Sequence, residues 1–313
     1  MPGSDASGGF RCLGLGEVLW DLLPAGKQLG GAPANFAYHA HALGGTARVI
    51  SRVGRDAAGR EILDRLRTLG LPVDGITEDP SAPTGTVSVQ LDARGTPAYT
   101  IHENSAWDFL EASPALLAEA AQADAVCFGS LGQRHPVARG TIRQLLQAVP
   151  THALRIFDIN LRQHYWSREL IEESLQLANV LKLNDEELPV VAKLLGWSGE
   201  ETVWLEQLAK QFHLRAIALT RGGKGSTLWL EGCLFHQPGA ALAIADTVGA
   251  GDSYTAALTL GLLHGHSAEE IIRFAHRVAD HVCTQPGATP TMPAELCRHF
   301  ARNRPKAEGG RKI

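Results

Sequence analysis

The chain has 313 residues, of which 44% are hydrophobic and 20% charged, as in an ordinary folded globular protein. Its 29 Lys and Arg against 33 Asp and Glu leave a formal net charge of −4, which offers nucleic acid no broad cationic surface. No segment approaches the roughly 20 consecutive apolar residues that a membrane helix needs. We therefore expect a small-molecule partner, with no nucleic acid and no membrane.

The cysteines and the two ends of the chain indicate the compartment. The five cysteines show neither a CxxC pair nor the spacing of a zinc site: Cys12, Cys127, Cys233, Cys283 and Cys297. This usage predicts reduced thiols and a cytoplasmic protein. Residues 1–9 are rich in Gly and Ser and lack the pattern of a secretory signal, so we expect a disordered tail there. Residues 301–313 are expected to form a flexible basic tail.

Strands and helices alternate from residue 10 onward. The first predicted strands are residues 10–15 and 47–53, and the first predicted helices are residues 34–43 and 56–69. The alternation resumes with strands at 125–128, 155–157 and 180–183, and with helices at 137–148 and 167–177. After a long helical stretch, strands at 216–220, 226–230 and 234–236 precede helices at 251–264 and 268–283. Without an internal repeat, this order predicts one large doubly wound α/β domain over residues 10–300.

Two β-branched-rich runs, residues 84–91 and 97–102, interrupt this alternation. Because no helix separates them, they cannot be consecutive strands of a parallel sheet. They are predicted to form a hairpin that serves as a small flap or lid.

The strongest motif is Asp-Thr-Val-Gly-Ala-Gly-Asp at residues 246–252, directly before an apolar helix. Gly249, Ala250 and Gly251 can present backbone N–H groups at a helix N-terminus, where a phosphoryl group is stabilised. Asp252 in the first turn can accept the proton of an attacking hydroxyl. The alternative is that Asp252 only caps a helix after a glycine turn.

A second motif, Gly-Gly-Ala-Pro-Ala-Asn at residues 30–35, opens the first helix. Gly31 permits close approach of a ligand, and Asn35 carries both a donor and an acceptor for neighbouring hydroxyls. Asp21 upstream can accept from a pair of hydroxyls. An ordinary turn from a loop into a helix explains the two glycines equally well.

Two further motifs follow strands. Asn184 and Glu187 combine an amide with a carboxylate after a strand, which suits hydrated Mg²⁺ beside phosphates, although a solvated acidic first turn explains them too. The glycine-rich turn at residues 220–225 lacks the Ser or Thr and the helix of a Walker motif. A nucleotide could lie against this turn, and a plain hairpin is an equal alternative.

Taken in this order, the motifs resemble the PfkB family of carbohydrate kinases, and most closely its fructokinase-like members. The resemblance spans nearly the whole chain and implies a ribokinase-like three-layer αβα sandwich with a small β lid, formed by residues 17–31 and 84–108. It implies that Asp252 is the catalytic base, that Gly249, Ala250 and Gly251 form the anion hole, and that Asp21, Gly31 and Asn35 hold sugar hydroxyls.

The resemblance also implies the nucleotide and metal positions. Asn184 and Glu187 match an NxxE element that serves Mg²⁺ and phosphate, and Arg162 belongs to a DxNxR element that contacts phosphate or sugar. The expected nucleotide contacts are Asn184, Thr220, Gly222, Gly225 and His276. Many relatives bind K⁺, and the matching positions are Asp246, Val248, Val282, Gln285, Gly287 and Thr291.

The expected function is that of an ATP-dependent sugar kinase, fructokinase-like, with a homodimer through the lid. Kinases for ribose, 2-keto-3-deoxygluconate, a nucleoside or a sugar phosphate remain alternatives, as does a non-catalytic sugar sensor with the same fold. Ribokinases carry a Glu after the strand at 125–128, and this chain has Ser130 to Gln133 there. That departure argues against ribose.

Overall fold

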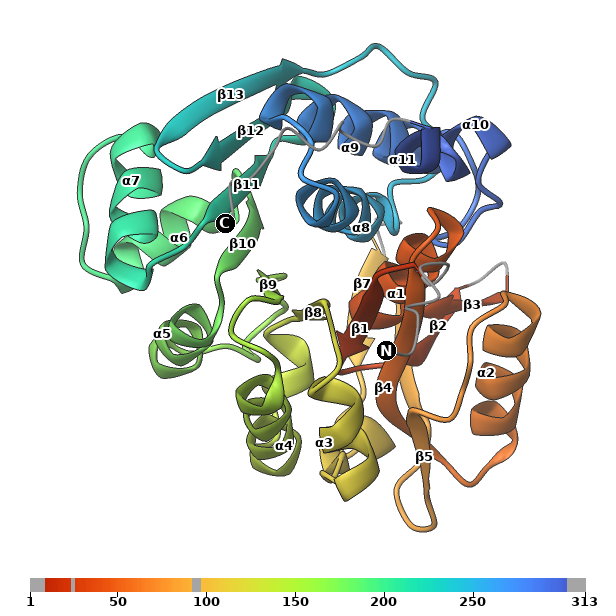
Figure 1. The fold of residues 1–313 in the computed structure, drawn as a ribbon. Coiled ribbons are helices and arrows are strands. Elements are labelled where there is room, and N and C mark those ends of the chain that lie inside the picture. The colour runs from red at the N-terminus through yellow and green to blue at the C-terminus, as the bar shows by residue number, and fades with distance from the viewer. Residues whose placement is uncertain (1–8, 24–25, 92–96, 303–313) are drawn as a thin grey trace, which may run out of the picture.

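The computed structural model describes residues 9–23, 26–91 and 97–302 (Figure 1). Within these residues the chain forms a nine-stranded sheet with helices on both faces. Most of the two predicted tails, residues 1–8 of 1–9 and residues 303–313 of 301–313, and the predicted turn at 92–96 lie outside the described residues, whereas residues 301–302 end a short helix. The predicted three-layer αβα sandwich with a small β lid is confirmed.

The large sheet places the functional loops at one edge. Its strands, in order across the sheet, are β13 (Cys233–Pro238), β12 (Gly225–Leu230), β11 (Ala216–Thr220), β10 (Val180–Asn184), β9 (Leu154–Asp158), β8 (Ala125–Phe128), β1 (Arg11–Leu15), β4 (Thr46–Gly54) and β5 (Ile76–Asp79). All pairs from β11 to β5 are parallel, whereas β12 and β13 pair antiparallel. Because parallel strands end at the same edge, the loops after β1, β9 and β10 lie together there.

Each face of the sheet has its own core and its own helices. One face is covered by α1 (Ala32–Ala42), α2 (Ala57–Thr68), α8 (Ala250–Leu263), α9 (Ala268–Cys283), α10 (Ala294–Cys297) and α11 (His299–Arg302). The other is covered by α3 (Pro114–Ala120), α4 (Pro136–Ala148), α5 (Arg168–Leu177), α6 (Glu187–Leu194) and α7 (Glu201–Phe212).

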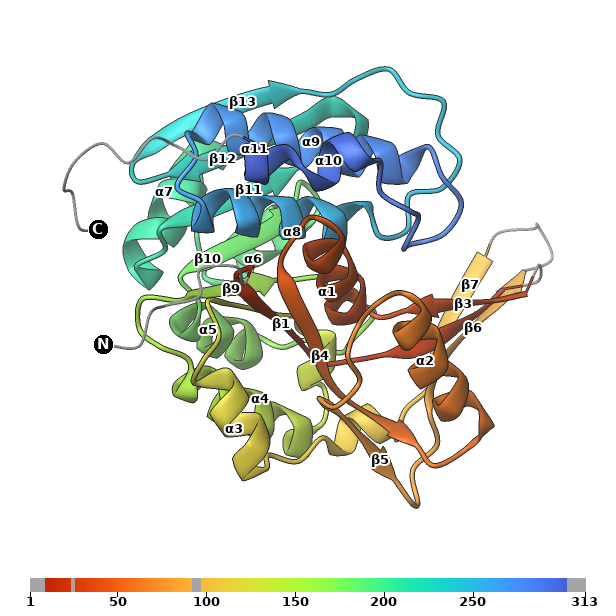
Figure 2. The same cartoon turned by 45° about the vertical axis from the view of Figure 1, so that its right-hand side comes forward.

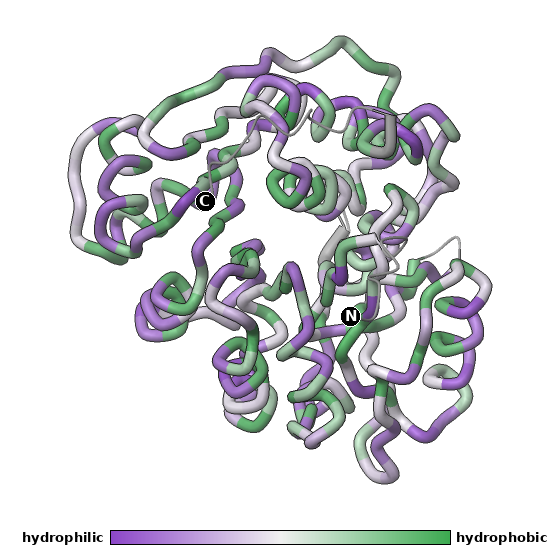
Figure 3. Tube along the Cα trace, viewed as in Figure 1, coloured by the Kyte–Doolittle hydropathy of each residue, from purple (hydrophilic) through white to green (hydrophobic). Residues whose placement is uncertain are grey.

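The alternation of side chains along β11 shows how the two cores differ. Ala216 and Ala218 face the first core, and Ile217 and Leu219 face the second. The small alanines lie in the same core as the buried residues of α8, a helix that is largely green in Figure 3. An apolar α8 over a small-residue surface is thereby held close to the strands whose ends form the site.

The lid sheet consists of β2 (Leu19–Leu23), β3 (Gly26–Gly30), β6 (Gly85–Leu91) and β7 (Pro97–Ile101), in the order β3-β2-β6-β7. It projects from the main body (Figure 2). β6 and β7 pair antiparallel, as the absence of an intervening helix predicts. A separate small core of Leu19, Val87, Ile101, Trp107 and Leu131 lies at its base. Three short 3-10 helices complete the fold: η1 (Ala106–Phe109), η2 (Leu131–Gln133) and η3 (Gly222–Lys224).

The long helical stretch before residue 216 is two helices, α6 and α7, because Gly196 and Gly199 between them adopt positive φ angles of 77° and 129°. A continuous helix cannot pass through such angles.

Among the helices of the described residues, none has both the length and the hydropathy that crossing a bilayer demands.

Candidate active site

Two helix N-termini meet at the carboxyl edge of the large sheet. α1 follows Gly31 and α8 follows Gly249, two glycines with positive φ. Asn35 in the first turn of α1 donates from Nδ2 to Oδ2 of Asp252 in the first turn of α8, over 2.8 Å. Since each helix N-terminus carries a partial positive charge, their meeting point favours an anion.

The backbone at Gly249 can be formed only by glycine. Its φ is 78°, and a Cβ atom there would lie 2.5 Å from the carbonyl oxygen of Ala288. Gly249 is the N-cap of α8, and no side chain caps the helix. The backbone N–H of Ala250 donates to the carbonyl oxygen of Thr247 over 3.3 Å, so the first-turn N–H groups left for a ligand are those of Gly251 and Asp252, and the anion hole expected at residues 249–251 stays a prediction.

The carboxylate of Asp252 turns toward Asn35, and Gly249 takes the cap position of α8. A plain capping role is thus not what this side chain performs. Burial raises the pKa of Asp252 to about 6, and the negative charge of Asp158 adds to the rise. The Asn35 hydrogen bond and the charges of Lys182 and Arg162 oppose it. A carboxylate with a pKa just below neutrality is ionised at pH 7 and accepts a proton readily.

Two more carboxyl groups lie close by. Asp21 on β2 lies over Gly30, where a Cβ atom would collide with its carboxylate. Burial raises the pKa of Asp21 to about 6, against the charge of Arg162. Burial also raises the pKa of Glu17 to about 7, and the charge of Asp252 contributes to that rise. Glu17 is only 4% exposed, and its Oε2 has no hydrogen-bond partner.

Two buried features of the site were not predicted from the sequence: Glu17, and the ion pair of Lys182 with Asp158. Lys182 Nζ on β10 lies 3.0 Å from Asp158 Oδ1 on β9, and both side chains are buried. A Cβ atom on Gly251 would lie 3.0 Å from that Nζ. The signal was present in the sequence, because a lysine within the apolar strand 180–183 of a parallel sheet must find a partner.

Arg162 follows β9 and is exposed. Its positive charge lowers the pKa of both Asp21 and Asp252, so it faces the site.

Gly31 brings the backbone of α1 against Glu17, whose carbonyl oxygen leaves no room for a Cβ atom. The structure thus gathers Asp21, Gly31, Asn35, Arg162 and Asp252, the five side chains and backbone positions expected around a sugar and a base.

Asn184 and Glu187 form a compact turn after β10. Asn184 Oδ1 accepts from the backbone N–H groups of Glu186 and Glu187, over 2.9 and 2.8 Å. The two oxygens of Glu187 accept from the N–H groups of Leu161 and Asn184, each over 2.9 Å. Every carboxylate oxygen keeps a second lone pair, which suits the water shell of Mg²⁺ better than direct coordination.

The predicted nucleotide loop is the tight connection between β11 and β12. Thr220 ends β11, and Gly222 and Gly225 have φ angles of 50° and 104°. The geometry is that of the hairpin alternative, and contact with a nucleotide stays a prediction. His276 Nε2 lies 2.8 Å from Ser226 Oγ, next to this turn. Burial lowers the pKa of His276, so its ring is neutral at pH 7.

The positions expected for K⁺ are only partly assembled. Asp246 accepts from the N–H groups of Val248 and Gly287, over 3.0 and 3.1 Å. The carbonyl oxygen of Val282 accepts from Gln285, and that of Thr291 lies 3.0 Å from His281 Nε2. Within the part of the chain that the structure describes, no cluster of three His, Cys, Asp or Glu could hold a metal. A monovalent cation here would depend on backbone oxygens.

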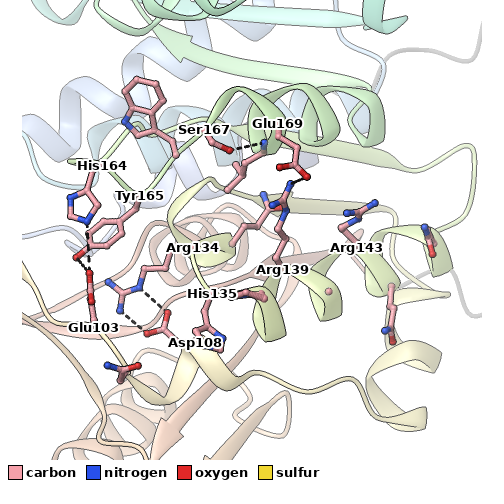
Figure 4. A pocket seen from close by; sticks show the side chains of 18 residues that line it. Glu103, Asp108, Arg134, His135, Arg139, Arg143, His164, Tyr165, Ser167 and Glu169 are labelled. Carbon is pink, nitrogen blue, oxygen red and sulfur yellow. Dashed lines mark hydrogen bonds and ion pairs between the residues drawn. The ribbon is translucent and has the colours of Figure 1, made fainter.

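A cavity of about 720 Å³ lies beside the lid base, between α4 and the loop before α5 (Figure 4). None of the predicted site residues lines it. Arg134 at its wall is paired with Asp108 over 2.8 Å and stacks over the rings of Trp107 and Tyr165, with its Cζ 4.0 and 4.9 Å from their centroids. Arg134 therefore ties the lid base to the body.

Residues 25–295 match the pfkB family carbohydrate kinases. The chain belongs to the pfkB family. Family members transfer a phosphoryl group to a sugar hydroxyl, so this pfkB kinase is a phosphotransferase with an alcohol group as acceptor.

Three relatives illustrate the similarity. Fructokinase of Escherichia coli is 30% identical over 296 residues, covering 89% of this chain and 95% of the relative. Fructokinase of Klebsiella pneumoniae is 32% identical over 266 residues, covering 80% and 84%. The structure of an uncharacterized sugar kinase of Pyrococcus horikoshii in complex with ATP is 26% identical, with a TM-score of 0.77 and coverage of 93% and 100%.

Proposed function

We propose that this pfkB family kinase transfers the γ-phosphoryl group of ATP to a hydroxyl of fructose, with Asp252 as the general base. The observation that carries the proposal is the meeting of α1 and α8, where Asn35 binds a carboxylate at an uncapped helix N-terminus. At this point the carboxylate can accept a hydrogen bond from the acceptor hydroxyl, and the helix N-terminus can stabilise an anionic phosphate.

The proposed reaction is an in-line displacement. The acceptor oxygen forms a bond to the γ-phosphorus, the bond from that phosphorus to the bridging oxygen of ADP breaks, and Asp252 takes the hydroxyl proton. Backbone N–H groups at Gly249, Ala250 and Gly251 stabilise the charge on the phosphoryl oxygens. Asn184 and Glu187 would hold Mg²⁺, which would supply further positive charge beside the phosphates. Closure of the lid sheet excludes water and so limits hydrolysis of ATP.

Three observations support fructose as the acceptor. Two relatives at 30% and 32% identity are named fructokinases. Ser130 and Gln133 lie near the position where ribokinases carry a Glu. Their side chains bind backbone carbonyl groups of the surrounding loops: Ser130 donates to Ile159 O, and Gln133 donates to Gly129 O. They do not supply the carboxylate expected for ribose. A sugar phosphate would need several free cations, and with Arg134 already paired with Asp108, Arg162 alone is left of the two candidate arginines.

We also propose the nucleotide and monovalent-cation sites, a dimer and the compartment. Thr220, Gly222, Gly225 and His276 would line the nucleotide, and K⁺ would bind beside Asp246. The lid sheet exposes Tyr99 to 57% and Leu22 to 40%, and a second copy of the chain could cover both. Light scattering on the protein and on Tyr99→Asp tests the dimer. The five free cysteines support a reducing, cytoplasmic location.

A sugar panel tests the proposed function directly. Purified protein with Mg-ATP and K⁺ is incubated with fructose, ribose, 2-keto-3-deoxygluconate, a nucleoside or a sugar phosphate, and ADP release is measured. We expect the highest kcat/KM with fructose. A higher kcat/KM with another acceptor would replace fructose by that acceptor. Sugar binding in calorimetry without ADP release from any acceptor would favour a non-catalytic sensor.

A further inference from the structure

A charged pair lies beneath the first turn of α8, inside the sheet. Lys182 and Asp158 project from neighbouring parallel strands, 4% and 3% exposed, with 3.0 Å between Nζ and Oδ1. Burial alone would lower the pKa of Lys182, but the charges of Asp158 and Glu187 raise it above its ordinary value. Lys182 is therefore a permanent buried cation at neutral pH.

The pair is joined to α8 through Thr255. Thr255 Oγ1 donates to Asp158 Oδ2 over 2.8 Å and lies 3.0 Å from the carbonyl oxygen of Gly251. Thr255 lies three residues after Asp252, on the same side of the helix. The ammonium group of Lys182 lies against the same turn, 3.0 Å from the position of a Cβ atom on Gly251. Movement of the pair would move the turn that carries the proposed base.

The charged groups that act on Asp252 come from β9, β10 and the loop after β9. Asp158 on β9 raises the pKa of Asp252, whereas Lys182 on β10 and Arg162 after β9 lower it. The negative charge of Asp252 in turn raises the pKa of Glu17, which follows β1, and of Cys127 on β8. Asp158 and Lys182 are the two members of this set that bind each other.

We propose that Lys182 and Asp158 are positioning residues for phosphoryl transfer: this buried pair fixes the first turn of α8 and balances the charge that Asp252 experiences. The proposal rests on the proposed role of Asp252 as the base. A purely structural role explains the pair less well, because burying two charges costs about as much as their attraction returns, and apolar replacements of similar size often stabilise a protein.

Lys182 lowers the pKa of Asp252 and Asp158 raises it, and this difference in sign provides the test. Lys182→Met removes a positive charge and leaves Asp158 unpaired, so the acid limb of the pH profile of kcat/KM should move up by about 1 pH unit. Asp158→Asn removes the negative charge, so the limb should move down by a similar amount. The double variant should titrate near the wild-type protein. Lys182→Arg keeps the positive charge, so it should recover most of the kcat that Lys182→Met loses.

Arg52 and Asp79 provide the matched control. Their pair on β4 and β5 also spans 3.0 Å and is largely buried, but it belongs to the far side of the sheet from α8. Arg52→Met and Asp79→Asn should lower the unfolding temperature without moving the acid limb. Equal shifts from both pairs, or shifts of the same sign from Lys182→Met and Asp158→Asn, would overturn the proposal.

A second readout does not need turnover. Carbon NMR of protein labelled at aspartate carboxyl groups, with the Asp252 resonance assigned through Asp252→Asn, follows the titration of Asp252 itself. The resonance should titrate at higher pH in Lys182→Met and at lower pH in Asp158→Asn. An unchanged titration in both would overturn the proposal. If no sugar in the panel is phosphorylated, the proposed function fails while this titration still decides the role of the pair.

Discussion

Asn35 Nδ2 lies 2.8 Å from Asp252 Oδ2, and this hydrogen bond joins residues that are 217 positions apart in the chain. It connects the helix that follows the first lid strands to the helix that carries the proposed base. Because the amide donates to the ionised carboxylate, it lowers the pKa of Asp252 against the effect of burial. The amide of Asn35 therefore helps to keep the proposed base in its proton-accepting form.

Asn35→Leu should lower kcat/KM by about 10²-fold at pH 7 and move the acid limb of its pH profile upward, because both a sugar contact and the hydrogen bond to Asp252 are lost. Steady-state kinetics between pH 5 and 9 measure both effects. His41, on the same helix but partly exposed, gives the control variant His41→Ala, which should leave the profile unchanged. A loss of activity without any shift of the limb would restrict Asn35 to sugar binding.

Gly249→Ala should lower kcat by about 10²-fold or more, since a Cβ atom would strike Ala288 O and displace the anion hole. The positive φ of 78° adds roughly 1–2 kcal/mol of strain to the folded state. Gly265→Ala is the control, because that glycine also has a positive φ, of 68°, but open space around it. It should show only the loss of stability caused by the positive φ in urea denaturation and leave kcat unchanged. Equal kinetic losses in both variants would contradict the assignment.

Glu17→Gln should stabilise the fold at pH 8 and much less at pH 4. Burial raises the pKa of Glu17 from 4.5 to about 7, so the folded state binds more protons than the unfolded state between these values. The free energy of unfolding contributed by this group therefore falls as the pH rises through that window, by roughly 1–3 kcal/mol. Urea denaturation of both proteins at pH 4 and pH 8 measures the difference. An equal gain at both pH values would show that charge is not the cause.

Arg162→Ala should raise KM for the sugar or for ATP by about tenfold, since one charge-assisted hydrogen bond contributes about 1.5–3 kcal/mol. Arg168→Ala is the control, because Arg168 is exposed and pairs only with Glu172 on its own helix among the contacts described. Its KM values should equal those of the wild-type protein. Unchanged KM values in Arg162→Ala would remove Arg162 from the site.

The sequence was informative wherever chemistry is local. A glycine run before an apolar helix predicts both the backbone geometry at Gly249 and the place of Asp252 in the first turn, because both depend on neighbouring residues alone. The hairpin of β6 and β7 follows from the absence of a helix between two strand patterns. The αβα layers follow from the alternation of strands and helices.

The rest depends on contacts between distant segments. Nothing adjacent to Glu17 in the sequence indicates that its carboxyl group is buried with an unpaired oxygen. The pairing of Arg134 with Asp108 joins two loops, so the sequence could not show that this cation is unavailable to a substrate. Lys182 could have been noticed as a charge in an apolar strand, but its partner on β9 and its position against Gly251 required the register of the sheet.

The most direct test of the account is single-turnover phosphoryl transfer by Asp252→Asn, with sugar and ATP binding measured in parallel by calorimetry. The asparagine keeps the shape of the side chain and its contact with Asn35 but cannot take the proton. We predict a rate lower by about 10³-fold or more with both dissociation constants within about threefold of wild type. A variant that transfers phosphate at a near-normal rate would contradict the assignment of Asp252 as the base.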